Sequence, residues 1–341
     1  MKKVPVYLML LVASTLFSTV AFSQKVGSTS MQFLKVMPCA RATAMGDAYS
    51  VLASGAEAVF WNPAGVARVQ NMELSLTYLK WIFDTQQGAF AFATSLGSFG
   101  SAGVQMQYVD FGEIDEALWS SPYKDATDTP GLTGRTFRPF AYVVGLSYAY
   151  QLTEKFMTGL SVKYAHESLY NGSTVTTITS QGDVVDAKTW ANGLMFDFGI
   201  WYNTGFRSVK LAASVQNFGP SVKYASEENS IPLALRVGIA ADVLGTDALL
   251  MPSESNRLGI AFDLFQPNDY AQQAHLGMEY EFNNMIALRM GYKFNYDADG
   301  FTAGLGVHQP VGSMNIFVDY SYGSLSYSLG SVHRISVGAG F

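Results

Sequence analysis

The sequence predicts an all-β fold, a transmembrane antiparallel β-barrel of about 14 strands. Three observations lead to this prediction. The composition is rich in aromatic residues and poor in charge, fourteen segments alternate apolar residues with small or polar ones, and the connections between the segments are alternately short and long. A period of two is typical of strands, and closed barrels with an even number of strands cross bacterial outer membranes.

Composition narrows the class of protein. Of 341 residues, 49% are hydrophobic and 14% aromatic, but only 14% are charged, whereas soluble domains carry about 25% charged residues. The aromatic content excludes intrinsic disorder. A net charge of −6 without a long basic run excludes a nucleic-acid-binding protein. The single cysteine, Cys39, excludes a disulfide framework and a cysteine-based zinc site. Composition alone fits both an outer-membrane barrel and a large secreted β-sandwich.

Residues 1–23 have the pattern of a secretory signal peptide. Lys2 and Lys3 precede an apolar stretch at 6–17, and Ala21-Phe22-Ser23 fits a cleavage site before Gln24. No later apolar run reaches 18 residues, so we expect no transmembrane helix, and the apolar residues must be buried in another way.

The alternation favours the barrel over the sandwich. Segment 286–296 carries large apolar residues at every second position, with small and charged residues such as Arg289, Gly291 and Lys293 between them. Because successive side chains of a strand point to opposite faces, we expect the apolar face to contact lipid and the other face to line a closed lumen. The predicted lumen charges, of which the last four are expected to lie close enough to pair, are Lys163, Asp197, Arg236, Asp263, Glu279, Glu281, Arg289 and Lys293.

Most of the fourteen segments have the roughly 9–11 residues that a tilted membrane strand needs. The last segment ends on Phe341, which resembles the signal read by the barrel-assembly machinery. Aromatic residues near segment ends are typical of membrane girdles; they are Trp81, Phe83, Tyr148, Tyr150, Tyr202, Tyr320 and Tyr322. The segments are 72–81, 87–96, 101–111, 139–151, 155–168, 189–203, 206–217, 233–243, 256–265, 271–283, 285–296, 299–308, 313–322 and 331–341.

The connections give an independent test of this strand count. With the N-terminus on the inner, periplasmic side, the long loops 112–138, 169–188 and 218–232 fall outside. The turns near Ser98, Thr153, Asn203, Asn283 and Gln309 fall inside and are short. Segment 244–255 breaks the rule, because it is long yet periplasmic. Either it is a true periplasmic excursion or the strand count slips there.

Residues 24–71 do not alternate and are rich in Ala and Gly. They contain two blocks, ARATAMGDAYSVLA at 40–53 and EAVFWNPAGVA at 57–67, and Pro63 and Gly65 require a turn after Asn62. Together these blocks resemble the PorV/PorQ family within the wider group of FadL-like outer-membrane proteins. The matching positions are Ala40, Arg41, Met45, Gly46, Asp47, Asn62, Pro63, Ala64 and Gly65.

The resemblance implies a bacterial outer-membrane protein with three parts: the signal peptide at 1–23, an N-terminal hatch at 24–71 that folds into the lumen, and the barrel at 72–341. The matching residues are interpreted mainly as structural. Gly46 and Gly65 would satisfy backbone geometry, Asn62 would bond its own turn, and Arg41 and Asp47 would pair with lumen charges.

The sequence gives only weak signs of metal binding, catalysis or cofactor binding. Four histidines lie on separate segments without metal-type spacing, so no metal site is expected, and 297–300 resembles a tight turn more than a calcium loop. No catalytic or cofactor motif appears. We therefore expect neither enzymatic activity nor a cofactor.

Three functions remain open. The favoured hypothesis, which the resemblance to the PorV/PorQ family implies, is a type IX secretion accessory that binds secreted cargo or translocon partners. Its first long loop offers acidic and aromatic residues for partner contact: Asp115, Glu116, Trp119, Tyr123 and Asp125. The second is a FadL-type channel for long-chain fatty acids or other hydrophobic compounds, with a wall kink that Gly103 or Gly145 could host. The third is a barrel that organises the envelope without transport.

Overall fold

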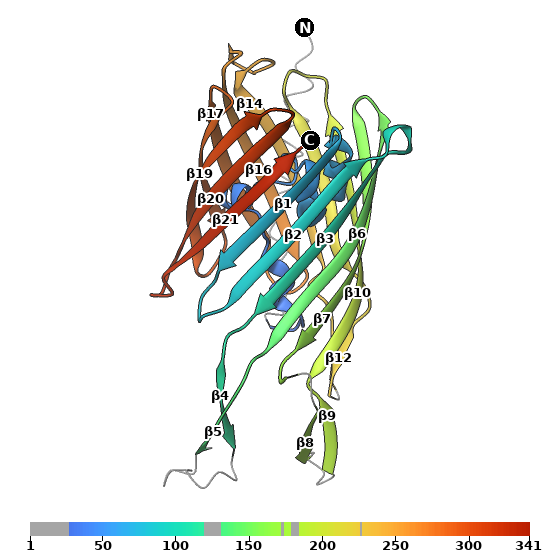
Figure 1. The fold of residues 1–341 in the computed structure, drawn as a ribbon, viewed down its shortest axis with the longest axis vertical. Helices are drawn as coiled ribbons and strands as arrows, with labels where there is room; N and C mark the ends of the chain where they lie inside the picture. The colour runs from blue at the N-terminus through green and yellow to red at the C-terminus, as the bar shows by residue number, and fades with distance from the viewer. Residues whose placement is uncertain (1–26, 119–130, 172–173, 179–183, 226) are drawn as a thin grey trace.

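A computed structural model describes residues 27–118, 131–171, 174–178, 184–225 and 227–341. Within these residues, fourteen antiparallel strands form one closed barrel, because the first strand pairs with the last (Figure 1). All fourteen predicted strands are present, which confirms the fold class. They are β1 (Met72–Lys80), β2 (Gln86–Ser95), β3 (Ser101–Asp110), β6 (Phe140–Thr153), β7 (Phe156–Ser168), β10 (Trp190–Asn203), β11 (Lys210–Phe218), β14 (Ala234–Gly245), β16 (Asn256–Pro267), β17 (Gln273–Phe282), β18 (Ile286–Phe294), β19 (Asp299–Val311), β20 (Met314–Leu325) and β21 (Ser331–Gly340).

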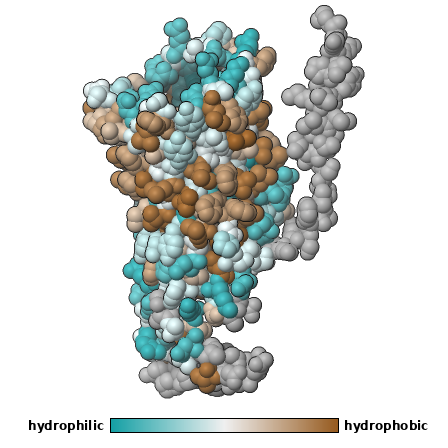
Figure 2. All heavy atoms as spheres, turned by 90° about the vertical axis from the view of Figure 1, so that its right-hand side faces the viewer, coloured by the Kyte–Doolittle hydropathy of each residue, from teal (hydrophilic) through white to brown (hydrophobic). Residues whose placement is uncertain are grey.

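Side chains alternate between the two faces of the barrel wall. In β18, Ile286, Leu288 and Met290 are exposed on the outside, whereas Ala287 and Arg289 are buried. On the face shown in Figure 2, apolar residues gather in a band across the middle, with polar surface above and below it. A band of this kind suits contact with the hydrocarbon core of a bilayer. No helix in the described part of the chain is long and apolar enough to cross a membrane.

Two details of the wall differ from the expectation. Trp81 does not belong to the outer girdle, because its ring lies 5.5 Å from the guanidinium of the buried Arg334, which the ring attracts. Neither Gly103 nor Gly145 hosts a kink, since β3 and β6 pair without a break and Gly103 lies opposite Ser147. Both glycines face inward, where they leave room for side chains.

Two long connections leave the barrel as two-stranded ribbons, at the end opposite the C-terminus (Figure 1). β4 (Ile114–Leu118) pairs with β5 (Gly131–Phe137), and β8 (Thr174–Ile178) pairs with β9 (Val184–Lys188). We call them the first and second ribbon, and the end that carries them the outer end. The third long connection forms β12 (Val222–Tyr224) and β13 (Glu227–Asn229) and folds back against β10.

Segment 244–255 is a true excursion at the opposite, periplasmic end. β14 ends at Gly245, the short β15 (Met251–Pro252) pairs alongside it in parallel, and β16 then continues the antiparallel barrel. The strand count therefore does not slip. The excursion is joined to the neighbouring turn by a hydrogen bond from Arg207 to the carbonyl of Ala248.

Residues 27–71, the N-terminal segment, wind through the inside of the barrel (Figure 1). The segment consists of short helical turns joined by bends, and most of its side chains are buried. Residues 40–44 pack against β18 to β21, and residues 63–68 pack against β6, β7 and β10. The turns are η1 (Gln32–Lys35), α2 (Ala40–Ala44), η2 (Gly55–Glu57), α3 (Ala58–Trp61) and η3 (Pro63–Arg68); a further turn, η4 (Gly97–Phe99), lies between β2 and β3.

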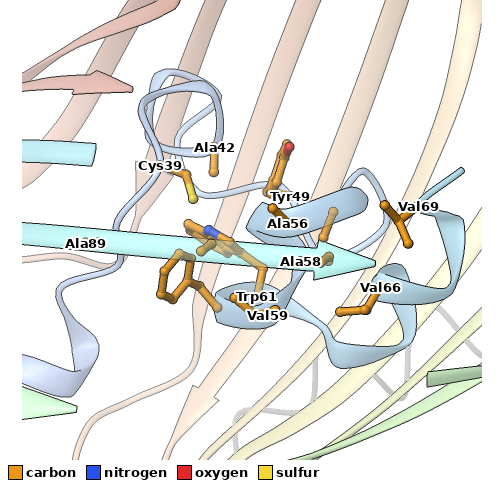
Figure 3. Packing of buried hydrophobic residues seen from close by; sticks show 14 of the residues in the cluster. Cys39, Ala42, Tyr49, Ala56, Ala58, Val59, Trp61, Val66, Val69 and Ala89 are labelled. Carbon is orange, nitrogen blue, oxygen red and sulfur yellow. The ribbon is translucent and has the colours of Figure 1, made fainter. Parts of the chain in front are cut away.

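An apolar core joins the N-terminal segment to the wall (Figure 3). Trp61 meets Tyr49 edge to face, with ring centroids 5.7 Å apart, and both side chains are fully buried. Alanines of β2 and β6 complete this cluster. Small wall residues are required here, because the segment and the wall share one narrow interior.

Candidate functional site

A cluster of charges ties the N-terminal segment to the periplasmic half of the wall. We call Arg41, Arg257, Arg289, Glu279 and Glu281 the arginine–glutamate cluster. The Nε and Nη2 atoms of Arg41 each donate to Glu279 at 2.8 Å, and Arg289 Nε donates to the same carboxylate at 2.6 Å. Arg257 also bonds Glu279, and its Nε donates to Glu281 at 2.9 Å. Glu279 is fully buried and is bound by three guanidinium groups.

A second network holds the bend after α2. Lys293 pairs with Asp47 at 2.8 Å and with Asp299 at 3.5 Å. Arg236 donates to the Asp47 carbonyl at 3.0 Å. Asp263 accepts from the backbone N–H groups of Tyr49 and Ser50, shortly after Asp47. Lys293 therefore pairs with the N-terminal segment and not with Glu279 or Glu281, whereas Glu279 and Arg289 pair with each other.

The remaining predicted lumen charges, Lys163 and Asp197, form a buried pair at 2.8 Å on β7 and β10. Asn217 joins them: its side-chain oxygen accepts from Lys163 at 2.6 Å and its N–H donates to Asp197 at 2.7 Å. The residues lie at an irregularity in the β10–β11 register. A buried charge that keeps a partner and further hydrogen bonds avoids the cost of unpaired burial.

The first block of the N-terminal segment rests on a pair of wall glycines. Gly277 and Gly291 lie directly opposite each other on β17 and β18. A Cβ at Gly291 would lie 2.2 Å from the Gly46 nitrogen, and one at Gly277 would lie 2.5 Å from the Met45 carbonyl oxygen. Only glycine lets the two backbones approach so closely. Gly46 itself has φ of +62°, a left-handed conformation that favours glycine.

The second block rests on another glycine pair, Gly159 opposite Gly199 on β7 and β10. A Cβ at Gly159 would lie 2.3 Å from the carbonyl carbon of Pro63. The Asn62 side chain accepts from the Ala64 N–H at 3.1 Å and donates to the carbonyl of Ile200 at 3.1 Å. The turn is thus both capped and tied to the wall.

Gly65 completes that turn within the N-terminal segment. A Cβ at this position would lie 2.3 Å from the Ala53 carbonyl oxygen. The contacts of Met45, Gly46 and the 62–65 turn are therefore all with protein, not with open space.

The outer mouth is filled by apolar side chains. Met31, Phe33 and Leu34 of the N-terminal segment pack with Val222 and Ile231 of the third connection. A carboxylate fixes the chain nearby: Asp269 accepts from Thr29 at 2.5 Å, from Gln32 at 2.8 Å and from Lys35 at 2.9 Å. Burial would raise the pKa of Asp269, but these donors outweigh it and hold the pKa below its ordinary value.

The first ribbon is fixed at its base by Glu116. Its carboxylate accepts from Thr133 at 2.7 Å, from Arg135 Nε at 2.9 Å and from the Tyr170 hydroxyl. The hydrogen bonds from Tyr170 and Thr133 hold the pKa of Glu116 at about 2. The Glu116 carboxylate is therefore hydrogen-bonded to groups of the protein itself, whereas Asp115 is exposed. Trp119, Tyr123 and Asp125 lie outside the described residues, as does the predicted signal peptide.

A Glu116→Gln substitution tests this role. A carboxylate with a lowered pKa stabilises the folded ribbon above its ordinary pKa, and that contribution is lost as the pH falls toward 2. At pH 7 the carboxylate is ionised, so we expect the variant to lose the charged acceptor and trypsin to cleave after Arg135 several-fold faster. Mass spectrometry of the fragments measures this rate. Equal cleavage rates in both proteins would contradict the role, and Asp115→Asn, a change at an exposed carboxylate, is the control.

Two cavities lie at the periplasmic end, and Arg41 and Ser54 line both. The first has a volume of about 310 Å³ and its wall includes Glu57, Glu73 and Asp319. The second has a volume of about 330 Å³, and its charged residues are Arg41, Arg68, Lys210, Asp242, Arg257 and Glu281.

Sequence reasoning missed several members of these networks, among them Arg257 and Asp319. Arg257 binds three carboxylates, and Asp319 accepts from Arg289 at 2.5 Å. Both occupy inward positions of alternating segments, so the period-two pattern carried the signal for them. The four histidines lie apart: His275 is buried beside Arg236, and His308 lies 3.5 Å from Asp319.

The sequence of this chain is similar to that of one known protein family. The family model described as type IX secretion system protein PorV matches residues 20–272. Among curated proteins, no sequence matches the chain significantly.

Several solved structures resemble the barrel. The toluene transporter TodX of Pseudomonas putida has a TM-score of 0.56 at 14% identity, over 87% of this chain and 96% of that chain. The toluene transporter TbuX of Ralstonia pickettii has a TM-score of 0.51 at 13% identity, over 87% and 96% of the chains. The monoaromatic hydrocarbon channel CymD has a TM-score of 0.53 at 11% identity, over 90% and 98%. At these identities the likeness shows a shared fold alone.

Proposed function

The chain belongs to the PorV family of type IX secretion system proteins of the bacterial outer membrane, and from this membership we propose that it is a secretion accessory that binds secreted cargo or translocon partners through its outer ribbons. The observation that carries the proposal is the pair of ribbons that stand clear of the barrel on its outer side (Figure 1).

The ribbons have the features of a protein-binding surface. Each is a separate two-stranded sheet, so each has outer strand edges that can pair with an extended segment of a partner. Leu132 on the first ribbon and Val184 on the second are 56% and 69% exposed. Apolar side chains on such an edge favour association with another chain.

The filled interior of the barrel supports the binding of partner proteins in preference to the passage of a solute through the barrel. The N-terminal segment acts as a permanent hatch: its apolar residues close the outer mouth, and its charges are locked to the wall near the periplasmic end. A solute that crossed the barrel would have to break the buried pairs of Arg41 and Lys293. A buried charge left without its partner is strongly destabilising, so these pairs oppose the passage of a solute.

A FadL-type channel for hydrophobic compounds is the alternative. The similarity to toluene transporters favours it at the level of the fold. The charged residues that line both cavities disfavour it, since an apolar solute gains nothing from contact with ion pairs.

Removal of the ribbons separates these functions. In one variant a short turn replaces residues 113–137, and in a second a short turn replaces 170–188. We expect secreted proteins or translocon subunits to co-purify with the native protein and to be lost from at least one variant, while the barrel still inserts. Unchanged co-purification and normal secretion in both variants would refute the proposal. Loss of hydrophobic-compound uptake with normal secretion, on deletion of the whole chain, would favour the channel.

A further inference from the structure

The second periplasmic cavity contains two cations without a carboxylate partner. Arg68 and Lys210 both line it, and among the described residues neither makes an ion pair with a carboxylate. The two carboxylates in its wall, Asp242 and Glu281, are already bound by Arg257 at 3.1 and 2.9 Å. The positive charge of Arg68 and Lys210 is therefore uncompensated within the cavity.

Arg68 is held in place independently of any ligand. Its guanidinium lies 5.2 Å from the centre of the Trp201 ring, and its Nη1 donates to the carbonyls of Val51 and Ala53 at 3.4 and 3.3 Å. Lys210 is the first residue of β11 and lines the same cavity from the barrel wall. Arg68 is thus positioned before anything binds, which lowers the entropy cost of binding at its side of the cavity.

The rest of the wall is polar and the space is ample. The cavity holds about 330 Å³, and the hydroxyl-bearing Ser54 and Ser208 lie in its wall with few large apolar side chains. This lining suits a small polar anion with an organic part and disfavours a fatty-acyl chain. Two cations together match a doubly charged group better than a single carboxylate.

We propose that this cavity binds an organic phosphate from the periplasmic side, with the phosphate between Arg68 and Lys210. The binding site is independent of the proposed function of the outer ribbons. The phosphate belongs either to a soluble phosphate ester or to the headgroup of an anionic lipid, since both present the same group.

Calorimetric titration of the purified full-length protein, in an uncharged detergent at low ionic strength, tests the site. We expect glycerol 3-phosphate to bind saturably at one site and glycerol not to bind. Lys210→Met and Arg68→Met should each weaken binding about tenfold or more, because each removes a charge-assisted hydrogen bond. Lys155→Met is the matched control: it removes an exposed lysine at the same end of the barrel and should leave the affinity unchanged.

Three outcomes would overturn the proposal: no saturable binding, unchanged affinity in Lys210→Met, or an equal loss in Lys155→Met, which would indicate only general charge attraction. Acetate binding as tight as glycerol 3-phosphate would overturn the assignment to phosphate. Titration with a short-chain phosphatidic acid distinguishes the two possible sources of the phosphate. Tenfold tighter binding than glycerol 3-phosphate supports a lipid headgroup, and equal affinity supports a soluble ester. Retention of the compact, heat-modifiable form on gels checks that each variant is folded.

Discussion

Glu279→Gln is expected to destabilise the barrel by about 3–5 kcal/mol, because it removes the fully buried negative charge that three guanidinium groups share. Arg289 keeps Asp319 at 2.5 Å, and Arg257 keeps Glu281 and Asp242. Among the carboxylates of the described residues, Arg41 keeps only that of Glu281, at 3.8 Å. Most of the loss should therefore fall on the contact between the N-terminal segment and β17. The free energy of unfolding in urea, measured after refolding into detergent or lipid, checks the magnitude.

A double-mutant cycle isolates that contact. If Arg41 and Glu279 act as a pair, Arg41→Met combined with Glu279→Gln should cost clearly less than the sum of the two single substitutions. Glu154→Gln is the control, because this glutamate is exposed in a periplasmic turn and should change stability by less than about 0.5 kcal/mol. Strict additivity of the two single changes would show that the observed hydrogen bonds carry no coupling energy.

The strands were predictable from the sequence because lipid and lumen impose opposite chemistry on alternate residues. Once the register is known, the same pattern accounts for the wall pairs, since Arg289 lies opposite Glu279 and Arg257 opposite Glu281. Adjacent strands place such residues side by side whatever the rest of the chain does.

The contacts of the N-terminal segment were not predictable in this way. Asp47 meets Lys293, which is far away in sequence, and the segment has no period that would orient its side chains. Glu116 shows the same limit, since its position in an acidic loop indicated a free carboxylate, whereas Tyr170 and Thr133 donate hydrogen bonds to it. The Gly-rich lumen face was predicted, but not which glycines face which turn. That depends on where the segment's backbone passes closest to the wall.

Gly291→Ala and Gly159→Ala are expected to dislodge the N-terminal segment from the wall. In both cases the added methyl group meets backbone atoms: the Gly46 nitrogen at 2.2 Å and the Pro63 carbonyl carbon at 2.3 Å. Overpacking a closed interior costs about 1–3 kcal/mol, and here no flexible side chain can move aside. We expect a loss at or above the upper end of that range. Trypsin should then cleave after Arg41 or Arg68, which are protected in the native protein because the segment is packed inside the barrel.

Gly88→Ala distinguishes a steric clash between the wall and the N-terminal segment from the general effect of alanine in a strand. Gly88 lies on the outer face of β2, and a Cβ there would meet nothing within 4 Å. Its stability should match the native protein, and the N-terminal segment should stay protected from trypsin. If Gly291→Ala behaved like Gly88→Ala in both measurements, the segment would not lie against the β17–β18 glycine pair. The role assigned to Met45 and Gly46 would then be wrong.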